Sequence, residues 1–315
     1  MPAPKNSVTT KEMNVALDQE LVKAFGGEYD RLAEILGIFS VETVAAGTAL
    51  YQTEVTGALN DAADADSGTS SGAAYVEGEE VALSQYTAKK TPVAVARPKP
   101  YRKLTTAEAI LKSGYDVAVL RTDRKMLSNL RNAVLDEFFE FLATGTGSAA
   151  GATLQATLAN VDATLGNSME TNGDSDAGGV VHFVNRLDAA EYIGAAPITT
   201  QTAFGMTYLQ TFLGIQNVFL TSKVAKGTVI ATPAENVHAY GVDFGALAQG
   251  GLSYATSSNG LVGVAHTPAY DRVSAETHVL SGLTLFPEVT DYIVKGAVGP
   301  AAASAAKTSG AKAAK

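Results

Sequence analysis

The 315-residue sequence contains no cysteine and no tryptophan. Without cysteine, the chain can form neither disulfide bonds nor thiolate metal sites. The lack of tryptophan does not exclude a large core, because hydrophobic residues make up 46% of the chain. A folded chain of about this length buries roughly 75% of the surface that the unfolded chain exposes. The composition therefore predicts a protein held together by ordinary apolar packing.

Positive charge is scarce as well. The chain has 23 lysine and arginine residues against 32 aspartate and glutamate residues, which gives a formal net charge of −9. Tight binding of nucleic acid depends on neutralising phosphates with lysine and arginine. This excess of negative charge argues against a protein that binds DNA tightly, and it is compatible with one that only encloses DNA.

Long apolar segments are also missing. No apolar run approaches the ~20 residues that a membrane-spanning helix needs. The first residues, MPAPKNSVTTKEMN, lack the apolar core of a signal peptide. We therefore expect a soluble cytoplasmic protein that has no membrane partner.

Motifs for catalysis and metal binding are absent from the sequence. There is no HExxH or GxSxG motif, and no histidine has a second histidine four residues away. We expect the histidines to be ordinary strand or surface residues; they are His182, His238, His266 and His278. The sequence thus predicts no enzyme, no catalytic residues, no metal site and no cofactor.

The segment from Tyr101 to Gly147 predicts two helices. Thr105 and Glu108 have the spacing of a capping box, and Gly114 stands where a left-handed C-cap would fall. We expect the second helix to begin at Thr122-Asp123, to run to about Thr144 and to be roughly 33 Å long. Its apolar face recurs at helical spacing. That face consists of Leu127, Leu130, Val134, Phe138 and Phe141.

The segment before these helices separates charge by sign. Residues 50–84 contain only acidic charges and residues 86–103 only basic ones. Two interpretations remain open. The two halves could pair with each other in a hairpin, or they could form an arm that lies on neighbouring subunits, where charges set its register. The second interpretation predicts inter-subunit contacts at Glu54, Glu77, Glu79, Glu80, Lys89, Lys90, Arg97, Lys99, Arg102 and Lys103.

Four other segments carry expectations. Residues 11–36 predict a helix that is interrupted at Gly26-Gly27 and lies outside the main core. Residues 145–152 predict a flexible joint, and residues 207–214 predict a short helix that Gly214 ends. The late strands LTLF and DYIVKGAV are expected to rejoin the long helix.

The succession of these elements resembles the major capsid protein of tailed bacteriophages. The segments that carry the resemblance are TTAEAILKSGYDVAV, RTDRKMLSNLRNAVLDEFFEFLATGTG, VVHFVNRLDAAEYIG, GTVIATPAENVHAYGVDF and LTLFPEVTDYIVKGAV. The resemblance implies an α+β chain with the Hong Kong 97-like fold, in which the long helix is called the spine helix. The implied parts are an N-terminal arm (1–49), an extended β-hairpin loop (50–103), a peripheral domain with the spine helix (104–151), a mixed α/β axial domain (152–268), a return to the peripheral domain (269–299) and a disordered tail (300–315).

The resemblance also implies a function. Copies of the chain would form hexamers and pentamers that close into an icosahedral head around double-stranded DNA, without sequence-specific DNA contacts. The implied partners are a portal, a separate scaffolding protein and, as an optional one, a decoration protein. The chain would reside in the virion capsid after assembly in the host cytoplasm. Two alternatives stay open: an encapsulin-type shell with a protein cargo, and an α/β enzyme with a dimerisation arm.

Overall fold

The computed structural model describes residues 10–37, 41–58, 83–173, 179–193, 200–244, 247, 250–256 and 261–299; of residues 10–16, 54 and 58 it describes only the backbone. The expected tip of the loop and the C-terminal tail lie outside these ranges. The chain divides into two compact units. Residues 49–95 form one, which we call the hairpin unit, and the rest of the chain forms the main unit.

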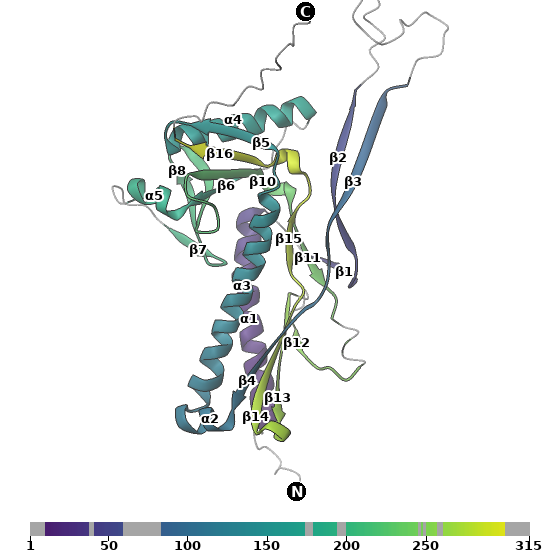
Figure 1. Cartoon of the computed structure of the whole chain (residues 1–315), viewed down its shortest axis with the longest axis vertical. Helices are drawn as coiled ribbons and strands as arrows, with labels where there is room; N and C mark the ends of the chain where they lie inside the picture. The colour runs from purple at the N-terminus through teal and green to yellow at the C-terminus, as the bar shows by residue number, and fades with distance from the viewer. Residues whose placement is uncertain are drawn as a thin grey trace, which may run out of the picture. The chain divides into compact units, whose positions relative to one another are not determined.

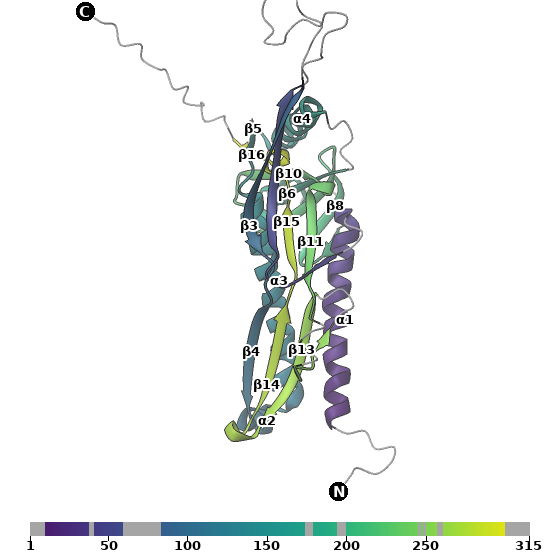
Figure 2. The same cartoon turned by 90° about the vertical axis from the view of Figure 1, so that its right-hand side faces the viewer.

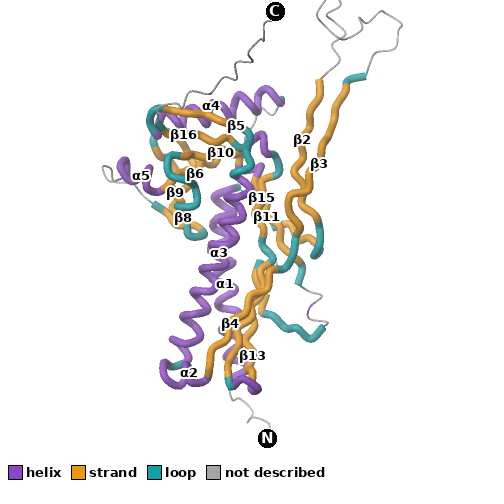
Figure 3. The backbone as a smooth tube through the Cα atoms, in the orientation of Figure 1, coloured by secondary structure: helices purple, strands orange, loops and turns teal. Residues whose placement is uncertain are grey.

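Helices and strands both contribute to the main unit, which confirms the α+β class (Figure 3). The helices are α1 (Thr10–Leu36), α2 (Ala107–Ser113), α3 (Arg121–Leu142), α4 (Leu154–Asn172) and α5 (Arg186–Ile193). The strands are β1 (Glu42–Val44), β4 (Lys99–Thr106), β5 (Gly147–Gly151), β6 (Val180–Asn185), β7 (Gln201–Ala203), β8 (Met206–Phe212), β9 (Ile215–Thr221), β10 (Thr228–Pro233), β11 (Val237–Val242), β12 (Ala255–Thr256), β13 (Val262–Ala269), β14 (Ser274–Ser281), β15 (Thr284–Pro287) and β16 (Val294–Val298). None of the described helices is long and apolar enough to cross a membrane.

The spine helix is α3, and it starts earlier than the sequence indicates. Thr106 caps α2 by accepting a hydrogen bond from the Ala109 amide, one residue later than the expected capping box, and Gly114 ends α2 with a φ of 77°. The chain then enters a π-helical turn at Asp116–Leu120 and continues directly into α3. Asp123 therefore lies inside a helix instead of capping it, and the predicted start at Thr122-Asp123 was wrong.

The N-terminal helix α1 is continuous and belongs to the core, which corrects two expectations. Gly26 and Gly27 do not interrupt it. Its buried side chains share one apolar core with those of α3, so α1 is not an arm outside the core. Figure 2 shows α1 running alongside β13. The ring of Phe25 also packs edge-on against Phe204 at 5.6 Å between centroids. Burial on two sides outweighs the cost of roughly 1 kcal/mol that each glycine adds to a helix.

A four-stranded antiparallel sheet lies beside these helices, in the order β12-β13-β14-β4. Strand β4 pairs with β14 over eight positions, from Thr106 opposite Ser274 to Lys99 opposite Ser281. Residues 99–106 are therefore part of the main unit. The extended loop, expected over 50–103, ends at Val95 because the next strand is fixed in this sheet.

The axial part is a seven-stranded sheet in the order β5-β16-β10-β6-β9-β8-β7, and α4 packs against β5, β16 and β10 (Figure 1). One expectation fails here. Residues 147–151, expected in a flexible joint, form strand β5 in parallel register with β16. Strand β16 joins this sheet and also meets the end of the spine helix, where Lys295 donates to the Ala143 carbonyl at 3.1 Å. The remaining strands form a three-stranded sheet, β1-β11-β15, whose strand β15 contacts α3.

The predicted helix over residues 207–214 is strand β8. Phe212 pairs with Ile215 of β9, and the two residues between them, Leu213 and Gly214, have φ values of 52° and 89°. Positive φ at both central positions is the signature of a two-residue β-hairpin turn. Gly214 therefore serves a hairpin and not the end of a helix.

Candidate functional site

The hairpin unit is a two-stranded antiparallel ribbon of β2 (Ala49–Ala58) and β3 (Gln85–Val95). The register places Glu54 opposite Lys89 and Val55 opposite Ala88. The two halves of the charged segment thus pair with each other, as the hairpin interpretation predicts. This pairing does not decide whether the ribbon also contacts neighbouring subunits.

The two faces of the ribbon differ in chemistry, because successive side chains of a strand point to opposite faces. Pairing places Tyr51, Val55 and Tyr86 on one face, which we call the apolar face. The ring of Tyr86 covers Gly57 so closely that a Cβ atom there would lie 2.3 Å from the ring. Thr53 and Lys90 share the apolar face, whereas Thr56, Thr87, Thr91 and Lys89 lie on the opposite face. The sequence analysis found the segregated charges but missed this alternation.

The apolar face is exposed to solvent in the single chain. Val55 is 65% exposed and Tyr86 is 60% exposed. An isolated two-stranded ribbon is marginally stable in water, and stable sheets need more strands or a packed face. Among the described residues, β2 and β3 pair only with each other. The apolar face is therefore an exposed surface that a partner could cover.

The predicted inter-subunit contacts divide into three groups. Glu77, Glu79 and Glu80, and the side chain of Glu54, lie outside what the structure describes. Lys89, Lys90 and Arg97 are exposed, the two lysines on β3 and Arg97 just beyond it. The third group, discussed next, has partners within its own chain.

Lys99, Arg102 and Lys103 form ion pairs with residues of the main unit. Lys99 Nζ lies 2.6 Å from a carboxylate oxygen of Glu137, and Arg102 pairs with Glu276. Lys103 Nζ lies 2.5 Å from Oδ1 of Asp123, a side chain that is only 2% exposed. All three basic residues belong to β4, which explains why they face α3 and β14. The structure shows these three residues in ion pairs within the chain. Their contacts with other subunits stay a prediction.

The predicted face of the spine helix points into the core. Leu127, Leu130, Val134 and Phe138 are buried. Phe141 is half-buried and packs edge-on against Phe286 of β15. Phe138 and Phe139 both contact Phe183 of β6, at 5.8 and 5.2 Å between ring centroids. These rings join the spine helix to the axial sheet.

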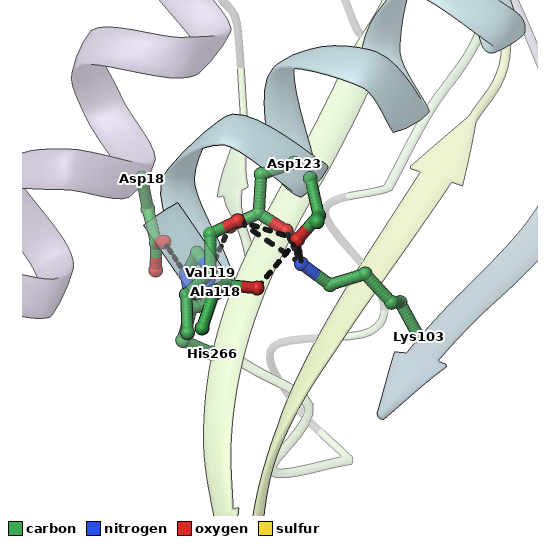
Figure 4. Close-up of polar contacts among 7 residues, drawn as sticks. Asp18, Lys103, Ala118, Val119, Asp123 and His266 are labelled. Carbon is green, nitrogen blue, oxygen red and sulfur yellow. Dashed lines mark hydrogen bonds and ion pairs between the residues drawn. The ribbon is translucent and has the colours of Figure 1, made fainter. Parts of the chain in front are cut away.

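A buried polar cluster joins four elements of the main unit, and Figure 4 shows its geometry. His266 of β13 lies between Asp18 of α1, which contacts Nδ1, and Asp123 of α3, which lies 2.9 Å from Nε2. Lys103 of β4 contacts the second carboxylate oxygen of Asp123 and donates to the Val119 carbonyl at 3.1 Å. We call Asp18, His266, Asp123 and Lys103 the four-residue cluster.

The charges in this cluster stabilise one another. Burial alone would lower the pKa of His266, but its hydrogen bonds to Asp123 and Asp18 outweigh burial and raise that pKa to about 9. Burial opposes ionisation of Asp123, yet hydrogen bonds from His266 and Lys103 hold the pKa of its carboxyl below the usual value. The raised pKa of His266 and the lowered pKa of Asp123 thus favour a charged pair around neutral pH, although both side chains are almost closed to water.

The sequence analysis missed this cluster and treated His266 as an ordinary strand or surface histidine. The contact between His266 and Asp18 spans 248 positions along the chain, and that with Asp123 spans 143. No local motif connects residues so far apart. One available signal was Asp123, a carboxylate on the apolar side of the spine helix. Among the described residues, no group of three or more histidine, cysteine or acidic side chains is arranged to hold a metal ion.

We expect Asp123→Asn to reduce the free energy of unfolding by about 3 kcal/mol, because removing one partner of a buried ion pair leaves the other charges uncompensated. Chemical denaturation at pH 7 would measure the loss. The matched control is Asp136→Asn on the same helix. Asp136 is 55% exposed and pairs with Lys223, so its substitution should cost less than about 1 kcal/mol. Equal losses for both variants would contradict a stabilising role for the cluster.

No protein-family model and no curated protein matches the sequence. The chain is similar to several solved structures. One, from Mycobacterium phage Che8, shares 9% identity over 79% of this chain and 85% of its own, with a TM-score of 0.47. The mature capsid of bacteriophage PhiM1 shares 6% identity over 82% of this chain and 85% of its own, with a TM-score of 0.47. The holo-SrpI encapsulin complex from Synechococcus elongatus shares 13% identity over 84% of this chain and 86% of its own, also with a TM-score of 0.47.

Proposed function

We propose that this chain is a shell-forming major capsid protein with the Hong Kong 97-like fold, and that it has a structural and not an enzymatic role. The observation that carries the proposal is the hairpin unit, whose apolar face is exposed in a single chain. The order of elements in the main unit adds support. A capped short helix leads into the spine helix, an α/β sheet follows, and the chain returns to β4 through β14.

A second copy of the same chain is the partner that best fits the apolar face. Tyr51, Val55 and Tyr86 offer apolar contact area, and Lys90, which pairs with Thr53 on the same face, adds one positive charge beside it. Each such contact is weak, but a closed shell repeats it in every copy, and repeated contacts gain strength through effective concentration. Lys89, Lys90 and Arg97, together with Glu54, Glu77, Glu79 and Glu80, would then set the register between neighbours.

The further partners are those of a capsid. Hexamers and pentamers would build the icosahedral head, with a portal, a scaffolding protein and an optional decoration protein. The excess of 9 negative charges suits a container in which DNA is enclosed without tight binding. Assembly in the host cytoplasm and a final place in the virion capsid belong to the same proposal.

Electron microscopy of the purified protein in negative stain tests the proposal. We expect closed shells of uniform size, and we expect particles from the natural source to protect double-stranded DNA from nuclease. Shells that hold a protein cargo and no DNA would favour the encapsulin-type alternative. A discrete dimer would favour the enzyme with a dimerisation arm and would contradict both container functions.

The ribbon itself is tested by Val55→Glu, which places a charge on the apolar face. We expect a folded subunit with nearly unchanged thermal stability, because exposed positions tolerate substitution within about 0.5 kcal/mol, but a loss of closed shells. Thr56→Glu is the matched control, since it puts the same charge on the neighbouring residue and the opposite face. Microscopy and sedimentation should show shells for the control. Normal shells from Val55→Glu would mean that the apolar face does not join subunits.

A further inference from the structure

The four-residue cluster fixes the N-terminal half of α1 to the rest of the main unit. Asp18 lies on α1, whereas His266, Asp123 and Lys103 lie on β13, α3 and β4 (Figure 4). The His266 side chain is 4% exposed and that of Asp18 is 9% exposed, so water cannot easily replace either partner. The contact between these two side chains therefore connects α1 to the spine helix through a single imidazole.

Only a doubly protonated imidazole satisfies both carboxylates. His266 faces Asp18 with Nδ1 and Asp123 with Nε2. A neutral imidazole has one N–H donor, and its other nitrogen is an acceptor. An acceptor nitrogen against an ionised carboxylate has no hydrogen to share and is repelled. When His266 loses a proton, one of the two hydrogen bonds must be lost.

The bond to Asp18 is the one that should be lost. Asp123 keeps Lys103 as a cationic partner, and both residues belong to the sheet and the spine helix. Among the described side chains, Asp18 forms its hydrogen bond with His266. An Asp18 carboxylate left without this partner would be buried and uncompensated, which is costly unless α1 moves into water.

Two features of α1 make such a movement local. Gly26 and Gly27 lie in the middle of the helix, and a Cβ at either would meet no atom within 4 Å. They weaken the helix without being required by packing. A groove of about 330 Å³ also lies between α1 and α3, lined in part by Leu17, Leu21 and Leu127. Burial also differs along α1: Leu21, Val22 and Phe25 are 8%, 4% and 5% exposed, whereas Tyr29, Leu32 and Leu36 beyond the glycines are 1%, 0% and 0% exposed.

We propose that residues 10–25 of α1 form a pH-dependent switch, which separates from the spine helix when His266 loses its proton and uncovers the apolar face beneath. The side chains uncovered would include Leu127 and Leu130 of α3, which share a core with Leu21 and Phe25. The switch is a property of the folded subunit and does not depend on whether the chain builds shells.

The direction of the pH dependence follows from the groups that face His266. The carboxylates of Asp18 and Asp123 raise its pKa to about 9 from an ordinary value of 6.5, while Lys103 faces Asp123 from β4. Among the described residues, Tyr115 and Asp116 are further titratable groups near the cluster, and the pKa of Tyr115 is raised by burial and by Asp123, Asp18 and Asp116. A raised histidine pKa stabilises the closed state below about pH 6.5, and that stabilisation is lost as the pH rises through about 9.

The absence of cysteine allows a direct test with single thiols introduced in the full-length chain. Val22→Cys reports on the buried side of α1, where Val22 is 4% exposed, and Leu111→Cys reports on a residue that is 86% exposed. The ratio of their alkylation rates cancels the effect of pH on the thiolate. We expect this ratio to rise roughly ten- to a hundredfold between pH 7 and pH 10. A ratio that stays flat over this range would overturn the proposal.

Three further variants separate the switch from general unfolding. Asp18→Asn should give a high ratio already at pH 7, with little further change. Glu34→Gln, which removes an exposed charge from the same helix, should behave like the parent. Ala231→Cys, buried in the axial sheet, should stay unlabelled at every pH. A rise at Ala231→Cys would indicate global unfolding, and an unchanged pH dependence in Asp18→Asn would show that the cluster does not control α1. Either result would refute the proposal.

Discussion

Deletion of residues 1–36 should leave a chain that cannot form a stable subunit. Helix α1 contributes six large buried side chains to the core shared with the spine helix; they are Leu21, Val22, Phe25, Tyr29, Leu32 and Leu36. Burying a large apolar side chain contributes roughly 1.5–3 kcal/mol. The sum is comparable to the 5–15 kcal/mol of net stability of a typical domain.

The truncated chain would also expose the apolar face of α3, so we expect it to aggregate on expression. Soluble yield and thermal unfolding followed by circular dichroism would measure the effect. Glu34→Gln, which removes an exposed charge from α1, is the control and should leave unfolding unchanged. A soluble 1–36 deletion that melts cooperatively near the temperature of the full chain would mean that α1 is a dispensable arm after all.

The spine helix was predictable because its signal is local. Leu127, Leu130, Val134 and Phe138 recur at the spacing of one helical face, and all four are buried. The same kind of pattern in α1 identified a helix but not its location. An apolar stripe can pack against its own chain or against another, and the sequence does not distinguish the two.

Gly26-Gly27 was predicted to interrupt a helix and Gly214 to end one, and both predictions were wrong, whereas Gly114 ends α2 as predicted. Gly26 and Gly27 lie inside α1, where tertiary packing outweighs their low helix propensity. Gly214 forms a hairpin turn with Leu213. Glycine tolerates many backbone conformations, so its presence is a weak predictor of a helix end. A capping side chain that forms a specific hydrogen bond, such as Thr106 at the start of α2, is a stronger predictor of a helix boundary.

The pattern of charged residues was informative for the exposed hairpin but not for the charged residues that folding buries. The separation of acidic and basic residues left two interpretations open, and the paired hairpin is present at β2 and β3. The pattern gave no sign of the pairing between Lys103 and Asp123, because folding brings these two residues together. The four-residue cluster could not be predicted for the same reason, since its members are distant in sequence and adjacent only after β13 packs against α1 and α3.

Phe138→Ala should reduce the free energy of unfolding by about 3–5 kcal/mol, the largest effect that we expect from a single substitution in the chain. The ring is 1% exposed and contacts Phe139 and Phe183 edge-on, so its removal leaves a cavity where the spine helix meets the axial sheet. Part of the loss is the hydrophobic free energy that burial of the ring contributes to folding, and part is the cost of the cavity that its neighbours cannot fill.

Two companion variants on the same helix grade the expected loss. Phe141 packs on Phe286 but is only half-buried, so Phe141→Ala should lose roughly half as much stability as Phe138→Ala. Lys125 is exposed, and Lys125→Ala should change stability by less than about 0.5 kcal/mol. Denaturant unfolding of the three subunits should rank the losses in the order Phe138, Phe141, Lys125. A Phe138→Ala subunit as stable as the Lys125→Ala subunit would place the Phe138 ring outside the core. It would also reverse the assignment of the buried face of the spine helix, because Leu127, Leu130 and Val134 share the helical spacing of Phe138 and would then lie on the surface too.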